Sequence, residues 1–191
     1  MRSSRLSITP GAVCFGCIGL ALNPLGLFLP FLCSAALHEL GHWAVLRLYH
    51  VPAEQLRITA LGCVMRTAPL SYRVEARCAF AGPGVNFLLF MLSVRIFPAF
   101  ALVNLSLALF NLLPLWPLDG GRLLRAMLCS RLAPDNAQKA ESLIAAVTVG
   151  LIWMLAAWAT CYLHMGLAPA VLAAGLTLRM GQEKLVAKNR G

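Results

Sequence analysis

The chain has 191 residues, of which 60% are hydrophobic and 12% are charged, and its formal net charge is +9. An average soluble domain carries about twice that charged fraction, so a water-soluble fold of this size could not bury so much apolar surface. The composition therefore excludes an ordinary soluble domain and predicts an integral membrane protein, built as a single domain over residues 1–191.

The apolar residues form about six long segments, as expected for helices that cross a bilayer. Backbone groups in lipid have to bond within their own segment, and the runs are continuous rather than alternating, which favours helices over strands. The segments are residues 8–22, 25–48, 74–94, 98–116, 140–163 and 166–180. We therefore expect an all-α membrane protein with about six transmembrane helices, whose first segment is retained rather than cleaved as a signal.

The basic residues indicate orientation rather than a nucleic-acid partner. If the N-terminus is cytoplasmic, all 16 Lys and Arg residues except Arg95 lie on the cytoplasmic side. This asymmetry is the one that orients membrane proteins. We expect a multi-pass protein in a lipid bilayer, with both termini in the cytoplasm and no nucleic-acid partner.

Three stretches interrupt the regular pattern. The least helical one, "AEQLRITALGCVMRTAPLSY" at residues 53–72, predicts a short strand or hairpin near 56–66, between the second and third helices on the cytoplasmic side. In "AGPGVNF", residues 81–87, the two glycines let helix backbones come close. The two prolines and two glycines of "NLLPLWPLDGGR", residues 111–122, exclude regular helix, and such backbone at membrane depth is buried in protein or lines a cavity.

The sequence His38-Glu39-Leu40-Gly41-His42 lies inside the second apolar segment. Residues four apart share a helix face, so the two histidines can bind one metal ion, with Glu39 placed as a general base toward an attacking water. Two imidazoles leave a tetrahedral zinc site short of one protein ligand. The pattern also arises by chance, with histidines that bond only to backbone carbonyls. However, an acid at the centre of a membrane helix costs about 2.5–3.5 kcal/mol, which favours a functional site.

Depth in the membrane favours Asp119 as the third ligand. His42 precedes Arg47 by five residues, which puts it about 7–8 Å below the cytoplasmic face. Asp119 precedes Arg122 at the end of a segment that runs inward, so it reaches a similar depth. An alternative interpretation makes Asp119 the N-cap of the next helix. The other candidates are too shallow, at the opposite face or in polar surroundings: His50, His164, Glu54, Glu75, Asp135 and Glu141.

Three asparagines lie in the apolar segments or at their ends. Asn104 is best explained as a side chain that forms a hydrogen bond to a neighbouring helix. Asn111, close to the proposed metal site, could hold a peptide carbonyl or orient a ligand. Asn86 follows the Gly-Pro-Gly bend, and it either bridges helices or supports a metal ligand from behind.

The two polar motifs together resemble the site-2 protease family of intramembrane zinc metalloproteases, peptidase family M50. The resemblance rests on His38-Glu39-Leu40-Gly41-His42 and on Asn111-Leu-Leu-Pro114-Leu-Trp-Pro117-Leu-Asp119-Gly120-Gly121-Arg122. The "AGPGVN" bend fits that family too, and the wording is most similar to its sporulation branch. The resemblance implies one Zn²⁺ per chain, held by His38, His42 and Asp119, with Glu39 as the general base.

The resemblance also implies how a substrate is bound. Asn111 and Pro117 would face the substrate, and the strand near 56–66, with Gly62, would pair with an unwound substrate by strand addition. The implied substrate is a membrane-associated protein cut near the cytoplasmic face, such as a tethered pro-sigma factor. Membrane inhibitory or regulatory proteins are further expected partners. The sporulation branch usually adds a C-terminal CBS domain, which we do not expect in this chain.

Two other functions stay open on the sequence alone. The first is a catalytically inactive relative that only binds membrane proteins. The second is a different zinc membrane hydrolase, such as a prenyl-protein peptidase, in which another glutamate or histidine is the third ligand.

Overall fold

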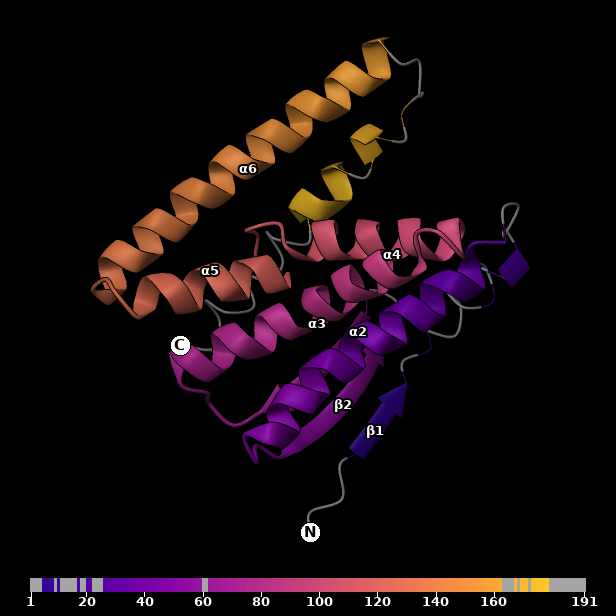
Figure 1. Ribbon diagram of the computed structural model, residues 1–191. Helices are drawn as coiled ribbons and strands as arrows, with labels where there is room; N and C mark the ends of the chain where they lie inside the picture. Colours follow the sequence, from indigo (N-terminus) through magenta and orange to yellow (C-terminus); the bar gives the residue numbers. More distant parts are fainter. Residues whose placement is uncertain are drawn as a thin grey trace. The chain divides into compact units, whose positions relative to one another are not determined.

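The computed structural model describes residues 5–8, 10, 17, 20–21, 26–59, 62–162, 167, 169–171 and 173–178. The chain divides into two compact units, Met1–Leu112 and Leu113–Gly191, which are described one at a time. The first holds β1 (Arg5–Ile8), α2 (Phe28–Leu48), β2 (Ala53–Thr59), β3 (Gly62–Thr67), α3 (Tyr72–Ser93) and α4 (Pro98–Asn111), and the second holds α5 (Asp119–Cys129) and α6 (Pro134–Tyr162) (Figure 1).

Helices lie over the four central apolar segments, from the second to the fifth. The helix of the fourth segment ends at Asn111 rather than at residue 116, because Pro114 and Pro117 follow. In the described part of the chain, two helices, α3 and α6, are long and apolar enough to cross a membrane. The first expected segment lies almost wholly outside the described residues and the last is described only in part, so six membrane helices remain a prediction.

Helix α2 buries one stripe of residues, most of them small or polar. Ser34, His38, His42 and Leu46 follow one another at four-residue spacing and are all buried, as is Gly41. Spacing of four residues keeps these side chains on one face of the helix. The helix ends at Leu48, and His50 follows with a φ of 54°, in the left-handed conformation that often ends helices. The motif residues therefore face the interior of the unit.

Helices α2 and α3 pack in close contact, and α3 also packs against α4 (Figure 1). A Cβ placed on Gly41 would lie 2.8 Å from the backbone oxygen of Ala81, so only glycine allows this separation of the two backbones. At the end of α2, Arg77 of α3 donates a hydrogen bond to the hydroxyl of Tyr49, and its guanidinium lies 5.7 Å from the centre of that ring. These contacts fix α3 alongside α2.

The first unit buries several polar side chains and exposes many large apolar ones. Buried polar residues come from all three helices and include Ser34, Asn86 and Asn104, each 0% exposed. Large apolar side chains are exposed on the outer faces of the same helices: Leu29, Leu40, Trp43, Phe80, Phe87, Leu88, Leu102 and Leu109. Exposing so much apolar surface to water is unfavourable, whereas exposing it to lipid is not. This distribution fits a unit that lies in a bilayer.

A three-stranded sheet in the order β1-β2-β3 accompanies these helices. Strand β2 pairs with β3 in antiparallel register, Thr59 opposite Gly62 and Leu56 opposite Met65. It pairs with β1 in parallel register, Arg5 opposite Gln55 and Ile8 opposite Ile58. The sequence predicts a strand or hairpin near 56–66, and β2 and β3 occupy that stretch. No pairing with the N-terminal residues was expected.

In the second unit, an irregular stretch precedes α5. Residues 113–118 form turns and bends, with a cis peptide bond between Trp116 and Pro117. Leu115 and Leu118 from this stretch pack with Ala145 of α6, and Val149 and Ile152 lie against them. A Cβ on Gly121 would come within 2.5 Å of the carbonyl carbon of Leu115, so the second glycine of the motif lets the turn fold back on α5.

We expect Gly41→Ala to loosen the first unit. The new methyl would meet a backbone oxygen that cannot move alone, so the free energy of unfolding should fall by roughly 1–3 kcal/mol. Gly150→Ala is the matched control, because a Cβ at Gly150 in α6 meets nothing within 4 Å. That variant should be unchanged or more stable by about 0.5–1 kcal/mol. Thermal unfolding of both variants in mild detergent measures the difference, and equal midpoints would contradict the close packing.

Candidate metal centre

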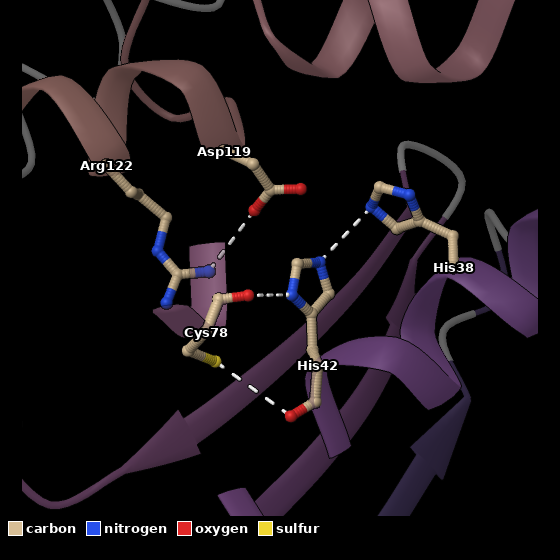
Figure 2. A network of polar contacts seen from close by, with 5 residues as sticks. All are labelled: His38, His42, Cys78, Asp119 and Arg122. Atoms are coloured by element: carbon tan, nitrogen blue, oxygen red, sulfur yellow. Dashed lines mark hydrogen bonds and ion pairs between the residues drawn. The ribbon is translucent and has the colours of Figure 1, made fainter. Parts of the chain in front are cut away.

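Two histidine rings from α2 meet in the interior of the first unit. His38 and His42 are each 6% exposed. Their Nε2 atoms lie 3.2 Å apart, and the rings stand nearly perpendicular, with centroids 4.8 Å apart (Figure 2). The four-residue spacing brings the rings to one face, and burial prevents them from turning to solvent. Two imidazole nitrogens this close can share a proton or bind one metal ion.

The ring of His42 is held in place by the backbone of α3. Its Nδ1 lies 2.7 Å from the carbonyl oxygen of Cys78, and the Cys78 Sγ lies 3.9 Å from the carbonyl oxygen of His42 (Figure 2). A carbonyl oxygen only accepts, so Nδ1 carries the hydrogen. The neutral ring then presents its lone pair on Nε2, toward His38. This is the arrangement that orients metal-binding histidines in proteins.

Gly82 of α3 leaves the space into which both rings extend. A Cβ at this position would lie 2.5 Å from Nε2 of His42 and 2.6 Å from Nε2 of His38. Gly84, two residues later, is different, because a Cβ there would meet only the ring of Phe80, at 3.4 Å. The first glycine of the Gly-Pro-Gly bend therefore makes room at the nitrogens themselves.

Glu39 follows His38 on α2 and is half-buried. It lies about 100° around the helix from its neighbour, so it borders the histidine face rather than lying on it. A carboxylate in this position can take up a proton beside the histidine pair without being one of the two converging ligands.

Asp119 belongs to the second unit, where it is the first residue of α5 and is 7% exposed. The N-cap of this helix is Leu118, so the interpretation of Asp119 as the cap is wrong. Nη1 of Arg122, one turn later, lies 3.4 Å from Oδ1 of Asp119 (Figure 2). His38, His42 and Asp119 are thus three buried residues of metal-binding type.

The other predicted residues take different positions. Asn111 is the last residue of α4 and donates from Nδ2 to the carbonyl oxygen of Leu107 at 3.0 Å. Pro117 lies half-buried in the irregular stretch before α5. Gly62 begins β3 opposite Thr59. Asn86 is fully buried in α3, and its side-chain atoms contact no hydrogen-bonding group of the described residues.

One contributor to the site could not be found from the sequence. The carbonyl of Cys78 belongs to the main chain, and every residue has one, so no residue pattern marks it. The glycines at 82 and 84 gave a partial signal, since the bend predicts a close approach of backbones without saying to which side chains.

Comparisons with known proteins find similar sequences and a similar fold. A family model described as Peptidase family M50 matches residues 91–155. Zinc metalloprotease MJ0392 of Methanocaldococcus jannaschii is 35% identical, over 55% of this chain and 35% of that protein. Stage IV sporulation protein FB of Bacillus subtilis is 26% identical, over 94% of this chain and 66% of that protein. The chain therefore spans about a third of the length of the first of these relatives.

A solved structure shows the same fold. The site-2 protease from Methanocaldococcus jannaschii matches with a TM-score of 0.63 and 24% identity, over 92% of this chain and 88% of that one. At this identity the likeness concerns the fold alone. The family model thus matches residues 91–155 of this chain to Peptidase family M50, and the chain has the fold of a site-2 protease.

Proposed function

We propose that the chain is a zinc-dependent intramembrane endopeptidase that cuts membrane-associated proteins near the cytoplasmic face. The observation that carries this proposal is the pair of buried Nε2 atoms 3.2 Å apart, one ring of which is held by the Cys78 carbonyl. A helix with an apolar outer face has no structural need for two histidines on its inner face. Metal binding explains their spacing, their burial and the orientation of His42 together.

The residues present fit a zinc ion. Imidazole nitrogens are common zinc ligands, and the lack of a side chain at Gly82 leaves space at both of them. Asp119 would complete the set of protein ligands, supported by its burial and by its carboxylate chemistry. Arg122, 3.4 Å from Oδ1, would orient that carboxylate. When bound, zinc acts as a Lewis acid and lowers the pKa of water to about 7.

In this proposal Glu39 is the general base. It takes a proton from the attacking water and later gives it to the leaving amine of the peptide. The hydrogen bond from His42 to Cys78 keeps Nε2 aimed at the reacting centre throughout. The apolar outer faces of α2, α3 and α4 admit a lipid-embedded substrate, while the polar interior accommodates water.

The substrate would be bound in an extended form, because the peptide bonds of a helix are shielded by its own hydrogen bonds. In the sheet β2 is paired on both sides, so it cannot accept another strand. Of the predicted hairpin only β3, which Gly62 begins, keeps an outer edge within the described residues. We therefore assign strand addition to β3, with Asn111 and Pro117 as further substrate contacts.

The motifs and one similar protein support a more specific substrate and topology. Stage IV sporulation protein FB is similar over most of this chain, which supports a tethered pro-sigma factor as the substrate class. The charge distribution supports a multi-pass topology with both termini in the cytoplasm. Membrane inhibitory or regulatory proteins would then control access to the site.

Glu39→Gln should abolish cleavage while zinc stays bound. Loss of a general base lowers the rate by about 10²–10⁴-fold, and the amide keeps the shape of the side chain. The measurement is release of a membrane-tethered transcription factor on co-expression in cells. Glu75→Gln is the control, since Glu75 is a half-buried glutamate of α3 outside the metal site. If wild type and Glu39→Gln release the factor equally, the chain is an inactive binding relative.

Loss of a residue that hydrogen-bonds to a metal ligand lowers metal affinity by about 10–100-fold. Asp119→Ala removes a proposed ligand itself, so it should lower zinc affinity by more than that. Asp135→Ala should leave it unchanged, because Asp135 is an exposed aspartate in the first turn of α6, in the same unit. Zinc content of the purified proteins, measured by mass spectrometry, separates the two. A variant at Asp119 that keeps both zinc and activity would instead favour a hydrolase of the prenyl-protein peptidase type.

Gly82→Ala should empty the metal site. The methyl would lie 2.5 Å and 2.6 Å from the two Nε2 atoms, closer than van der Waals contact, so the rings have to move and the space for an ion is lost, whereas Gly84→Ala meets only a movable ring. We expect zinc to be lost from Gly82→Ala and retained in Gly84→Ala, as measured by the zinc content of the folded proteins. Equal zinc in both variants would mean that the rings bind no metal at this face.

A further inference from the structure

Three helices of the first unit bury polar side chains that the protein itself does not satisfy. Ser34 of α2, Asn86 of α3 and Asn104 of α4 are all 0% exposed. Among the described residues, nothing hydrogen-bonds to Oγ of Ser34, to Oδ1 of Asn104, or to either polar atom of the Asn86 amide. Asn104 uses only its Nδ2, which donates to the carbonyl oxygen of Phe100 at 2.9 Å.

The packing of α2 on α3 places two of these residues at one level. Cys78 contacts His42, and four residues further along α3 a Cβ on Gly82 would touch His38, four residues earlier on α2. The two helices are therefore antiparallel, and a shift of four residues forward on α3 corresponds to a shift of four residues backward on α2. By the same rule, Asn86 on α3 lies at the level of Ser34 on α2, one turn from His38. Asn104 lies on the buried face of α4, which packs against both helices.

Such groups are rarely left unsatisfied. Burying an amide or hydroxyl without a partner costs free energy, and buried polar groups without a protein partner normally bond to ordered water. A buried water makes about two to four hydrogen bonds, which a hydroxyl and two amides can supply. We propose that Ser34, Asn86 and Asn104 form an internal binding site for ordered water, one helical turn from His38 and on the side away from His42.

Water fits this set of atoms better than a cation does. None of the three side chains is charged. The amide nitrogen of Asn86 donates, so it needs an acceptor, and a metal cation offers none. A water molecule accepts from this nitrogen and donates to the oxygens of Asn86, Ser34 or Asn104. The proposal holds whether or not the chain is a protease. If the proposed function holds as well, the site keeps water one turn from a metal ligand, inside a bundle whose outer faces are apolar.

A structure of the full-length protein in lipid, at a resolution that shows ordered water, tests the proposal directly. We expect density at hydrogen-bonding distance, about 2.7–3.2 Å, from the Asn86 side chain and from at least one of the other two. A direct hydrogen bond between Asn86 and Asn104 that leaves no such density would overturn the proposal, as would a dry contact around Asn86.

Substitutions give an independent test, because the proposal predicts whether the thermal unfolding midpoint rises or falls. Removing a hydrated amide in Asn86→Leu should lower the thermal unfolding midpoint in detergent by several degrees, whereas removing an unsatisfied amide would raise it. Ser34→Ala should lower it less, and the double variant should be less than additive because the two share water. Ser93→Ala is the matched control, since this buried hydroxyl already donates to the Leu89 carbonyl oxygen at 2.6 Å in its own helix.

The two remaining outcomes are also decisive. An unchanged or raised midpoint for both Asn86→Leu and Ser34→Ala refutes the water site. Midpoints of the wild type are expected to be equal in sodium chloride and in choline chloride at the same concentration. Stabilisation by sodium that is lost in Ser34→Ala would assign the site to a cation instead. Should Asn86→Leu not fold, Ser34→Ala and the structure of the wild type still decide the question.

Discussion

The metal centre depends on how closely the backbones of α2 and α3 approach each other. Two glycines, one on each helix, set that separation: a side chain at Gly41 would meet a backbone oxygen, and one at Gly82 would meet the histidine rings. The same approach brings a main-chain carbonyl to His42. The orientation of the histidine rings therefore depends on the packing of α2 on α3, and a change that separates the two helices disturbs both.

The distribution of polarity is compatible with the proposed hydrolytic chemistry in an apolar chain. The outer faces of α2, α3 and α4 present leucine, phenylalanine and tryptophan, while histidine, asparagine and serine lie inside. A soluble enzyme has the reverse arrangement at its surface. Here the exterior suits lipid and the buried polar residues suit water, so under the proposed function a membrane-embedded substrate would reach the reacting groups although each needs a different solvent.

The sequence predicted the parts of this structure that depend on side-chain type and spacing. Long apolar runs predicted the helices α2, α3, α4 and α6, and the four-residue interval predicted that His38 and His42 share a face. The prolines after Asn111 predicted the irregular stretch. The parallel pairing of β1 was not predicted, because four residues give little local signal and their partner lies about fifty residues away. Asp119 was assigned by depth and family resemblance, and its role as a ligand remains a prediction.

The partner of His42 is a peptide carbonyl, and this has a consequence for genetics. A carboxylate in the same place could be deleted by one codon change, and its loss would reveal the contact. The oxygen at Cys78 survives replacement of the thiol by almost any residue. Deep mutational scanning at position 78 would therefore detect only the effects of side-chain size and shape. It would not detect the hydrogen bond from His42 to the carbonyl oxygen, which sets the tautomer of the ring. Backbone chemistry, such as an amide-to-ester exchange that weakens the carbonyl as an acceptor, would be needed to expose it.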